Sequence, residues 1–167
     1  MGISLRAAKL EDAGVINDIY NHFVNTCTCT WQESPSTIAE REAWMQQHDE
    51  RYPVVVAVDD ENGAVVGWGS LSSMSTRSGW RYTVEDSIYI HPAYQGRGIG
   101  RKMIAELIAR AKKLGYRSVV GIISGDQPGS LGLHRAAGFE EVGRLRRAGE
   151  KLGRVLDAVY MQLEVRS

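Results

Sequence analysis

The stretch from residue 83 to residue 102 constrains the fold of this chain more than any other part of the sequence. It opens with eight residues whose apolar positions recur with a period of two, which predicts a β-strand. A proline turn follows, and three glycines at alternate positions then lead directly into a helical pattern. A glycine-rich turn at a helix start offers free backbone N–H groups and the positive end of the helix dipole to an anion. The sequence therefore predicts a site for a phosphorylated ligand at this junction.

The glycine run, Gln95-Gly96-Arg97-Gly98-Ile99-Gly100, differs from two common phosphate loops. It lacks the Gly-Lys-Ser/Thr ending of a P-loop, and its glycines are evenly spaced, unlike those of a dinucleotide-binding fingerprint. What remains is an N–H-rich cradle that suits a pyrophosphate, with Arg97, Arg101 and Lys102 placed to reach further phosphate oxygens. The alternative that the glycines only form a tight turn stays open on this loop alone.

The strand before this loop carries a carboxylate, Glu85, in its middle. Strand geometry places Glu85, Ser87 and Tyr89 on one face and Asp86 with its apolar neighbours on the other. A carboxylate on a strand covered by helices has its pKa raised by desolvation, which suits a base that collects a proton from an ammonium group. The alternative is a structural ion pair with Arg77 or Arg81.

Length, composition and net charge limit the classes of function open to this chain. The 167 residues are 43% hydrophobic and 24% charged, which predicts one globular domain over residues 1–167. Twenty basic residues balance twenty acidic ones, so no global field favours nucleic acid or an anionic membrane. No apolar run approaches the roughly 20 residues that span a bilayer, and no signal peptide opens the chain, so we expect a cytoplasmic protein.

The two cysteines, Cys27 and Cys29, are one residue apart. This spacing disfavours an intrachain disulfide and suits a reducing compartment. His22 is the only nearby further metal ligand, and structural zinc wants four, so we expect no metal site.

The remaining elements follow from periodicity and turn residues, and they predict a mixed sheet flanked by helices. We expect helices over 12–24, 37–48 with Ser36 as the cap, 101–114 and 130–137. We expect strands over 3–7, 52–58, 64–72, 80–91, 117–123, 141–147 and 155–165.

The glycine loop resembles the Q/R-x-x-G-x-G/A acetyl-coenzyme A loop of the GCN5-related N-acetyltransferases (GNAT). Nearly the whole chain is similar to the phosphinothricin and methionine sulfoximine N-acetyltransferase branch of that superfamily. The matching segments are Ile19-Tyr20-Asn21-His22, Glu50-Arg51-Tyr52-Pro53, Thr83-Val84-Glu85-Asp86-Ser87-Ile88-Tyr89-Ile90-His91-Pro92, Leu133-His134-Arg135-Ala136-Ala137-Gly138-Phe139 and Leu152-Gly153-Arg154-Val155-Leu156-Asp157.

The resemblance implies acetyl transfer from acetyl-CoA to the α-amino group of a small amino acid whose side chain ends in a tetrahedral, oxyanion-like group. Glu85 matches the family's proposed base. His134 stands where many members place the acid that protonates the thiolate, or it simply lines the cofactor groove. The residues implied to bind acetyl-CoA are Ile88, Tyr89, Ile90, Gln95, Gly96, Arg97, Gly98, Ile99, Gly100, Arg101 and Gln127.

The resemblance also assigns the acceptor site. Arg77 matches an arginine expected to pair with an anionic side chain, and Glu85, Asp86 and Ser87 border the acceptor. Trp31 is either an apolar wall of the pocket or part of the core. Three positions depart from the family pattern: Ser75 replaces a basic residue, Asp86 follows Glu85 in place of a histidine, and Gln127 replaces an asparagine that contacts the cofactor.

The fold implied is a mixed α+β GNAT fold, with a mostly antiparallel central sheet flanked by about four helices. The resemblance further implies a homodimer and no metal. Two alternatives stay open: a GNAT enzyme acting on another amine (a protein N-terminus, an aminoglycoside or a polyamine) and a catalytically silent acyl-CoA-binding module.

Overall fold

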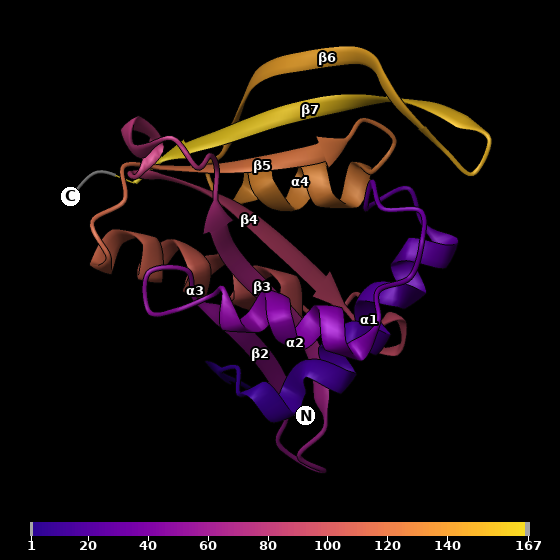
Figure 1. The fold of residues 1–167 in the computed structure, drawn as a ribbon, viewed down its shortest axis with the longest axis vertical. Coiled ribbons are helices and arrows are strands. Elements are labelled where there is room, and N and C mark those ends of the chain that lie inside the picture. The colour runs from indigo at the N-terminus through magenta and orange to yellow at the C-terminus, as the bar shows by residue number, and fades with distance from the viewer. Residues whose placement is uncertain (1, 166–167) are drawn as a thin grey trace.

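The computed structural model describes residues 2–165 (Figure 1). Within these residues the strands form one seven-stranded sheet in the order β1-β2-β3-β4-β5-β7-β6. Its neighbours are antiparallel except for the parallel pair β4–β5, so the predicted mixed, mostly antiparallel sheet is confirmed. The strands are β1 (Ile3–Ala7), β2 (Val54–Asp59), β3 (Val65–Ser73), β4 (Thr83–Ile90), β5 (Ser118–Ser124), β6 (Glu140–Lys151) and β7 (Arg154–Glu164).

Helices cover both faces of the sheet. On one face α1 (Ala13–Thr26) and α2 (Ile38–Gln46) pack on an apolar cluster that includes Trp68, and Figure 1 shows these two helices side by side. On the other face α3 (Ile99–Lys113) and α4 (Pro128–Ala136) pack on a second cluster. Because strand residues alternate, β2 supplies Val54 and Val56 to the first cluster and Val55 and Ala57 to the second. Both faces of the central strands are thus buried.

Most element boundaries differ from the sequence predictions by a few residues, and three of the differences bear on the site. The cap of α2 is Thr37 and not Ser36: Thr37 Oγ1 accepts from the Glu40 N–H at 3.1 Å, and Glu40 Oε2 accepts from the Thr37 N–H at 2.8 Å. Strand β4 begins at Thr83, because residues 78–80 form the 3-10 turn η2 (Ser78–Trp80). Helix α3 begins at Ile99, directly after a left-handed Gly98. The other 3-10 turns are η1 (Leu10–Asp12) and η3 (Pro92–Tyr94).

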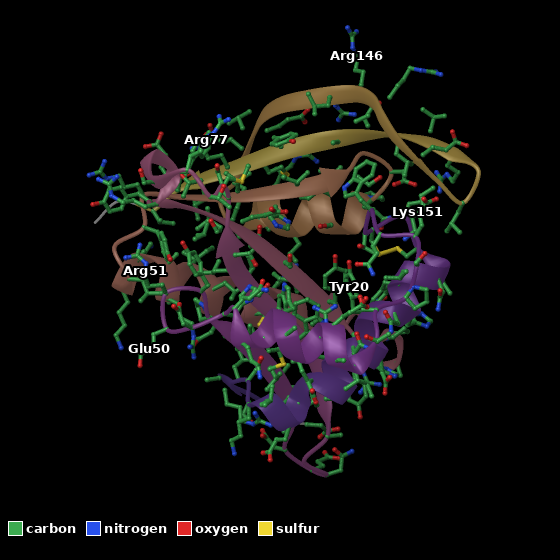
Figure 2. The ribbon with its side chains drawn as sticks, viewed as in Figure 1. Tyr20, Glu50, Arg51, Arg77, Arg146 and Lys151 are labelled. Carbon is green, nitrogen blue, oxygen red and sulfur yellow. A yellow bond between two sulfur atoms is a disulfide. The ribbon has the colours of Figure 1, made fainter. Side chains whose placement is uncertain are left out.

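Strand β6 is longer than predicted and lies at the end of the sheet, where it pairs only with β7. The two strands form an arm that arches over the rest of the molecule (Figure 1). The arm's tip is fastened to the loop after α1, since Lys151 Nζ donates to the Thr30 carbonyl at 2.8 Å and the Trp31 ring lies against Gly149. The Lys151 side chain is buried there, and burial lowers its pKa (Figure 2).

The expectation that Cys27 and Cys29 do not form a disulfide is wrong. Cys27 and Cys29 are joined by a disulfide in the loop after α1, although their spacing disfavours one. The bridge closes a tight local turn in which the Cys29 N–H also points to Cys27 Sγ at 3.1 Å. Within residues 2–165, no helix is long and apolar enough to cross a bilayer.

Candidate active site

The central feature of the site is the point where β4 and β5 separate. The two strands pair in parallel only from Thr83 to Glu85, although β4 continues to Ile90 and β5 to Ser124. Beyond Glu85 the edge of β4 therefore faces an opening in the sheet. An opening of this kind exposes backbone groups that a regular sheet would pair.

Strand alternation identifies which backbone groups face the opening. The His91 N–H donates to the Val66 carbonyl of β3 at 2.8 Å, so the N–H groups of Ile88 and Ile90 point to the opposite edge. The Ile90 carbonyl on that edge accepts from Gln95 Nε2 at 3.3 Å. The N–H groups of Ile88 and Ile90 are thus directed towards the gap.

The glycine loop adjoins the end of β4. Gly96 and Gly98 have φ values of 74° and 78°, a left-handed conformation that favours glycine, and Gly98 is the residue before the first turn of α3. Space around both glycines is open, and Ile99 anchors the helix start in the core with 2% exposure. Arg101 and Lys102 are exposed on the first turn, and the Arg97 guanidinium lies over the Tyr94 ring. Free N–H groups, cations and an open approach together fit the diphosphate of acetyl-CoA.

Glu85 lies at the edge of the opening on the face covered by α1 and α2. Within residues 2–165, its carboxylate has no hydrogen-bond or ion-pair partner, and neither Arg77 nor Arg81 reaches it. Burial raises the pKa of Glu85, and the neighbouring charge of Asp86 raises it further. The structure thus supplies a carboxylate with an increased tendency to accept a proton.

Asp86 points to the opposite face, where it meets His134 of α4. The Asp86 side chain is 2% exposed, and its Oδ2 lies 2.9 Å from His134 Nε2. His134 Nδ1 lies 2.8 Å from the Ser130 carbonyl, so both ring nitrogens face acceptors and both donate in the imidazolium form. Burial lowers the pKa of His134, but the hydrogen bond and charge of Asp86 more than offset this and raise it overall. Asp86 therefore lies away from the face that carries Glu85.

The other predicted site residues lie at several places. Ser87 shares the face of Glu85, whereas Arg77 is exposed on the loop between β3 and β4 (Figure 2), where its N–H donates to Ser75 Oγ at 3.2 Å. Trp31 packs against the β6 arm. Gln127 precedes α4, and its Nε2 donates to Thr28 Oγ1 at 2.8 Å, which ties the loop after α1 to the end of β5.

A polar and aromatic cavity of about 420 Å³ lies under α1 and α2 on the Glu85 face. Ser72 and Ser87 contribute hydroxyls, and Ser72 stands directly opposite Glu85 in the β3–β4 register. His48 Nε2 lies 2.9 Å from Ser72 Oγ and His48 Nδ1 2.8 Å from the Trp44 carbonyl. A neutral ring donates from Nδ1 and accepts from the serine, which agrees with the lowering of the His48 pKa by burial.

Sequence reasoning missed the cation of this cavity, Arg41. Its guanidinium lies over the rings of Tyr20 and Trp44, at 4.7 Å from each centroid. Helical spacing could have indicated it, because Arg41 lies three residues before Trp44 and four before Met45 and so shares the face of α2 that packs against the sheet.

Comparison with known proteins agrees with this geometry. Residues 16–139 match the family described as Acetyltransferase (GNAT) family. The L-methionine sulfoximine/L-methionine sulfone acetyltransferase of Salmonella typhimurium is 37% identical over 164 residues, which cover 98% of this chain and 95% of that protein.

Two solved structures are also similar over nearly their whole length. An acetyltransferase from Salmonella typhimurium with its cofactor acetyl-CoA has a TM-score of 0.95 and 35% identity, covering 100% of this chain and 96% of that one. A GNAT superfamily phosphinothricin acetyltransferase from Sinorhizobium meliloti in complex with acetyl-CoA has a TM-score of 0.94 and 39% identity, covering 98% of this chain and 89% of that one. The chain therefore belongs to the GNAT family of acetyltransferases, as its sequence predicted.

The raised pKa of Glu85 predicts how its replacement changes stability. The folded state holds the Glu85 proton more tightly than the unfolded state, so this contribution is present below about pH 4.3 and is lost as pH rises through the folded pKa. Glu85→Gln should therefore gain stability relative to the parent between about pH 4 and pH 7 in denaturant unfolding. The exposed Glu50 (Figure 2) provides the control, because Glu50→Gln should show no such trend. A falling relative stability of Glu85→Gln over this range contradicts the expectation.

The Asp86–His134 pair predicts a pH trend of the same direction at higher pH. His134→Asn leaves the Asp86 carboxylate buried without a cation and should cost about 3 kcal/mol near neutral pH. Because the folded pKa of His134 is raised, its contribution is complete below about pH 6.5 and is lost as pH rises through the folded value. Urea unfolding from about pH 6 to pH 9 should show that the difference in the free energy of unfolding between the parent and His134→Asn becomes smaller as pH rises. A gap that widens with pH would contradict this, and exposed His22→Asn is the control.

Proposed function

We propose that this protein transfers the acetyl group of acetyl-CoA to the α-amino group of a small amino acid whose side chain ends in a tetrahedral, oxygen-rich group. Methionine sulfoximine, methionine sulfone, phosphinothricin and arsinothricin are acceptors of this class. One observation carries the proposal: the unpaired, partly buried carboxylate of Glu85 stands beside the opening between β4 and β5. The names of the similar proteins described above support the choice of acceptor.

Each part of the opening has a proposed role in the reaction. Acetyl-CoA supplies an acetyl group activated as a thioester, and residues 95–101 hold its diphosphate through backbone N–H groups and cations. Glu85 takes a proton from the acceptor ammonium, directly or through water. The amine nitrogen then bonds to the acetyl carbon, while the N–H groups of Ile88 and Ile90 stabilise the negative charge that develops on the carbonyl oxygen. The carbon–sulfur bond breaks as the nitrogen loses its second proton, and CoA leaves as a thiolate that takes up this proton to give the free thiol.

The remaining predicted residues are assigned by their positions. Ser87 and Arg77 border the acceptor from β4 and from the loop before it. Asp86 and His134 support the site from the opposite face, where the two ring nitrogens of His134 lie against Asp86 Oδ2 and the Ser130 carbonyl. Trp31 and Gln127 hold the loop after α1 in place, and Tyr89 contributes to the cavity wall. Ser75 orders the loop that carries Arg77 by accepting from its N–H.

A thiol-release assay with acetyl-CoA tests the acceptor class. The tetrahedral amino acids named above should react with kcat/KM at least about tenfold higher than methionine, since a missing polar contact costs more than 1.4 kcal/mol when buried. Glu85→Gln should lower kcat/KM by about 10² to 10⁴ and leave binding of acetyl-CoA unchanged, whereas Glu50→Gln should be near the parent. Acetylation of a peptide amine with no reaction of any of these amino acids would assign the enzyme to another amine. Binding of acetyl-CoA with no acetylation of any amine would favour the silent acyl-CoA-binding module.

We further propose that the protein is a homodimer and that it acts in the cytoplasm, where acetyl-CoA is formed. The outer edge of β6 has no partner strand within the described residues. Val142 and Leu145 on β6 are 58% and 54% exposed, and Leu152 and Val155 at the tip of the arm are 54% and 50% exposed. An unpaired edge with exposed apolar side chains is suited to a second copy of the same strand.

Light scattering after size exclusion measures the assembly. The parent should have the mass of two chains, and Leu145→Glu should weaken association at least about tenfold because it places a charge in the interface. Leu114, which is 38% exposed at the end of α3, provides the control, and Leu114→Glu should stay dimeric. A parent that is monomeric at all concentrations contradicts the dimer, and an unchanged Leu145→Glu dimer places the interface elsewhere.

A further inference from the structure

Arg41 is a buried cation that has no anionic partner in the described part of the chain. Its side chain lies beneath α2 with 6% exposure, enclosed by the rings of Tyr20, Trp44 and Trp68, the last at 5.4 Å from the guanidinium carbon to the ring centroid. Within residues 2–165, its guanidinium makes no hydrogen bond or ion pair. The Nε atom is fully enclosed and unpaired. Figure 2 labels Tyr20, which lies on α1 on the side of the sheet that α1 and α2 cover.

This arrangement is unusual in physical terms. A buried guanidinium presents five donors, and leaving them unpaired costs free energy that stacking on rings offsets only in part. Burial lowers the pKa of Arg41, yet an arginine remains charged at neutral pH. The rings hold the planar group in one orientation, in which Nε is enclosed and the terminal Nη donors remain for a ligand.

The donors have access to the cavity on the Glu85 face. Arg41 lines this cavity together with the hydroxyls of Ser72 and Ser87 and the ring of Tyr89. The carboxylate that also lines it, Glu40, accepts from the Thr37 N–H and is exposed. The cavity thus combines a fixed positive charge with apolar ring walls and neutral hydrogen-bonding groups, and its one carboxylate is engaged in the cap of α2.

The position of the cavity relates Arg41 to the proposed reaction. Trp68 and Tyr89 face each other across β3 and β4, and Ser72 and Glu85 form another such pair further along the same face. Glu85 and Tyr89 are four residues apart, or about 13 Å along the strand. Arg41 is stacked over the Trp68 end, and the cavity extends from there to Ser72. An acceptor whose amine reaches Glu85 through a bridging water can therefore extend its side chain along the cavity towards Arg41.

We propose that Arg41 determines acceptor specificity by binding the terminal oxygens of the acceptor side chain. The planar fork suits a phosphinate or another tetrahedral group with two oxygens. The acceptor's α-carboxylate is attached to the same carbon as the amine, so it stays at the Glu85 end of the cavity. This inference rests on the proposed function, and it assigns the anion contact to α2 in addition to the loop that carries Arg77.

Arg41→Gln tests the assignment with two acceptors that differ in charge. The Kd and KM for phosphinothricin should rise about 10- to 100-fold, because a hydrogen-bonded ion pair is removed. The kcat/KM for methionine and the KM for acetyl-CoA should stay within about threefold. Arg117→Gln is the matched control, since Arg117 also lies over a ring, that of Tyr82, but at an exposed position outside the cavity. Equal losses for both acceptors would make Arg41 a purely structural residue and overturn the proposal.

Binding measurements separate this inference from the proposed function. Calorimetric titration of phosphinothricin without acetyl-CoA reports the Arg41 contact even if no acetyl transfer occurs. A parent that acetylates phosphinothricin while Arg41→Gln keeps the same affinity sinks the inference and leaves the function intact. A parent that neither binds nor acetylates any tetrahedral amino acid overturns both.

Two further measurements cover the case in which Arg41→Gln does not fold. Arg41→Lys keeps the charge between the rings but loses the fork, so phosphinothricin affinity should fall by a smaller factor than in Arg41→Gln. In the parent, phosphinothricin should change the fluorescence of Trp44 and Trp68, which contact the guanidinium, more than methionine does. Identical emission with and without saturating phosphinothricin would contradict the contact.

Discussion

The early separation of β4 from β5 is the constraint on which the rest of the structure depends. A parallel pair that continued to Ile90 would consume the N–H groups of Ile88 and Ile90 and close the sheet over Glu85. Because pairing stops at Glu85, one position in the fold has a carboxylate, unpaired backbone donors and the start of α3 all directed at the same opening. The strand order stabilises this separation, because β5 is held along its other edge by antiparallel pairing with β7.

The adjacent carboxylates of Glu85 and Asp86 on β4 lie in different environments, because successive residues of a strand point to opposite faces of the sheet. Asp86 faces α4 and meets a histidine, so its charge is neutralised in the core. Glu85 lies on the cavity's face of the sheet, opposite Ser72, and among residues 2–165 it meets no cation, while Arg41 on the same face meets no anion. A fold that paired these two groups with each other would gain an ion pair but would have neither a base nor an anion site. Because the two charges stay apart, a ligand with both an ammonium group and an anionic group can pair with each of them and so gain electrostatic free energy on binding.

Much of this organisation could be predicted from the sequence, because it rests on local signals. The glycines at 96 and 98 and the period-two pattern of β4 define the loop, the strand and the face of Glu85. Thr37 and not Ser36 is the cap because Glu40, three residues after Thr37, completes a capping box, whereas Ala39 holds the equivalent position after Ser36. Arg41 was missed, and Asp86 and His134 were predicted singly but not as a pair, since these contacts join segments far apart in the chain. The Cys27–Cys29 disulfide contradicted a preference drawn from spacing alone.

The attachment of Lys151 to the Thr30 carbonyl couples two parts of the molecule that have separate tasks. The loop that carries Thr30 also carries Gln32, which lines the acceptor cavity, while Lys151 ends the strand whose free edge faces outward. A partner that shifts the β6 arm therefore also acts on the cavity wall, and an acceptor that orders the wall acts on the arm. By thermodynamic reciprocity, any effect of subunit association on acceptor affinity equals the effect of the acceptor on association.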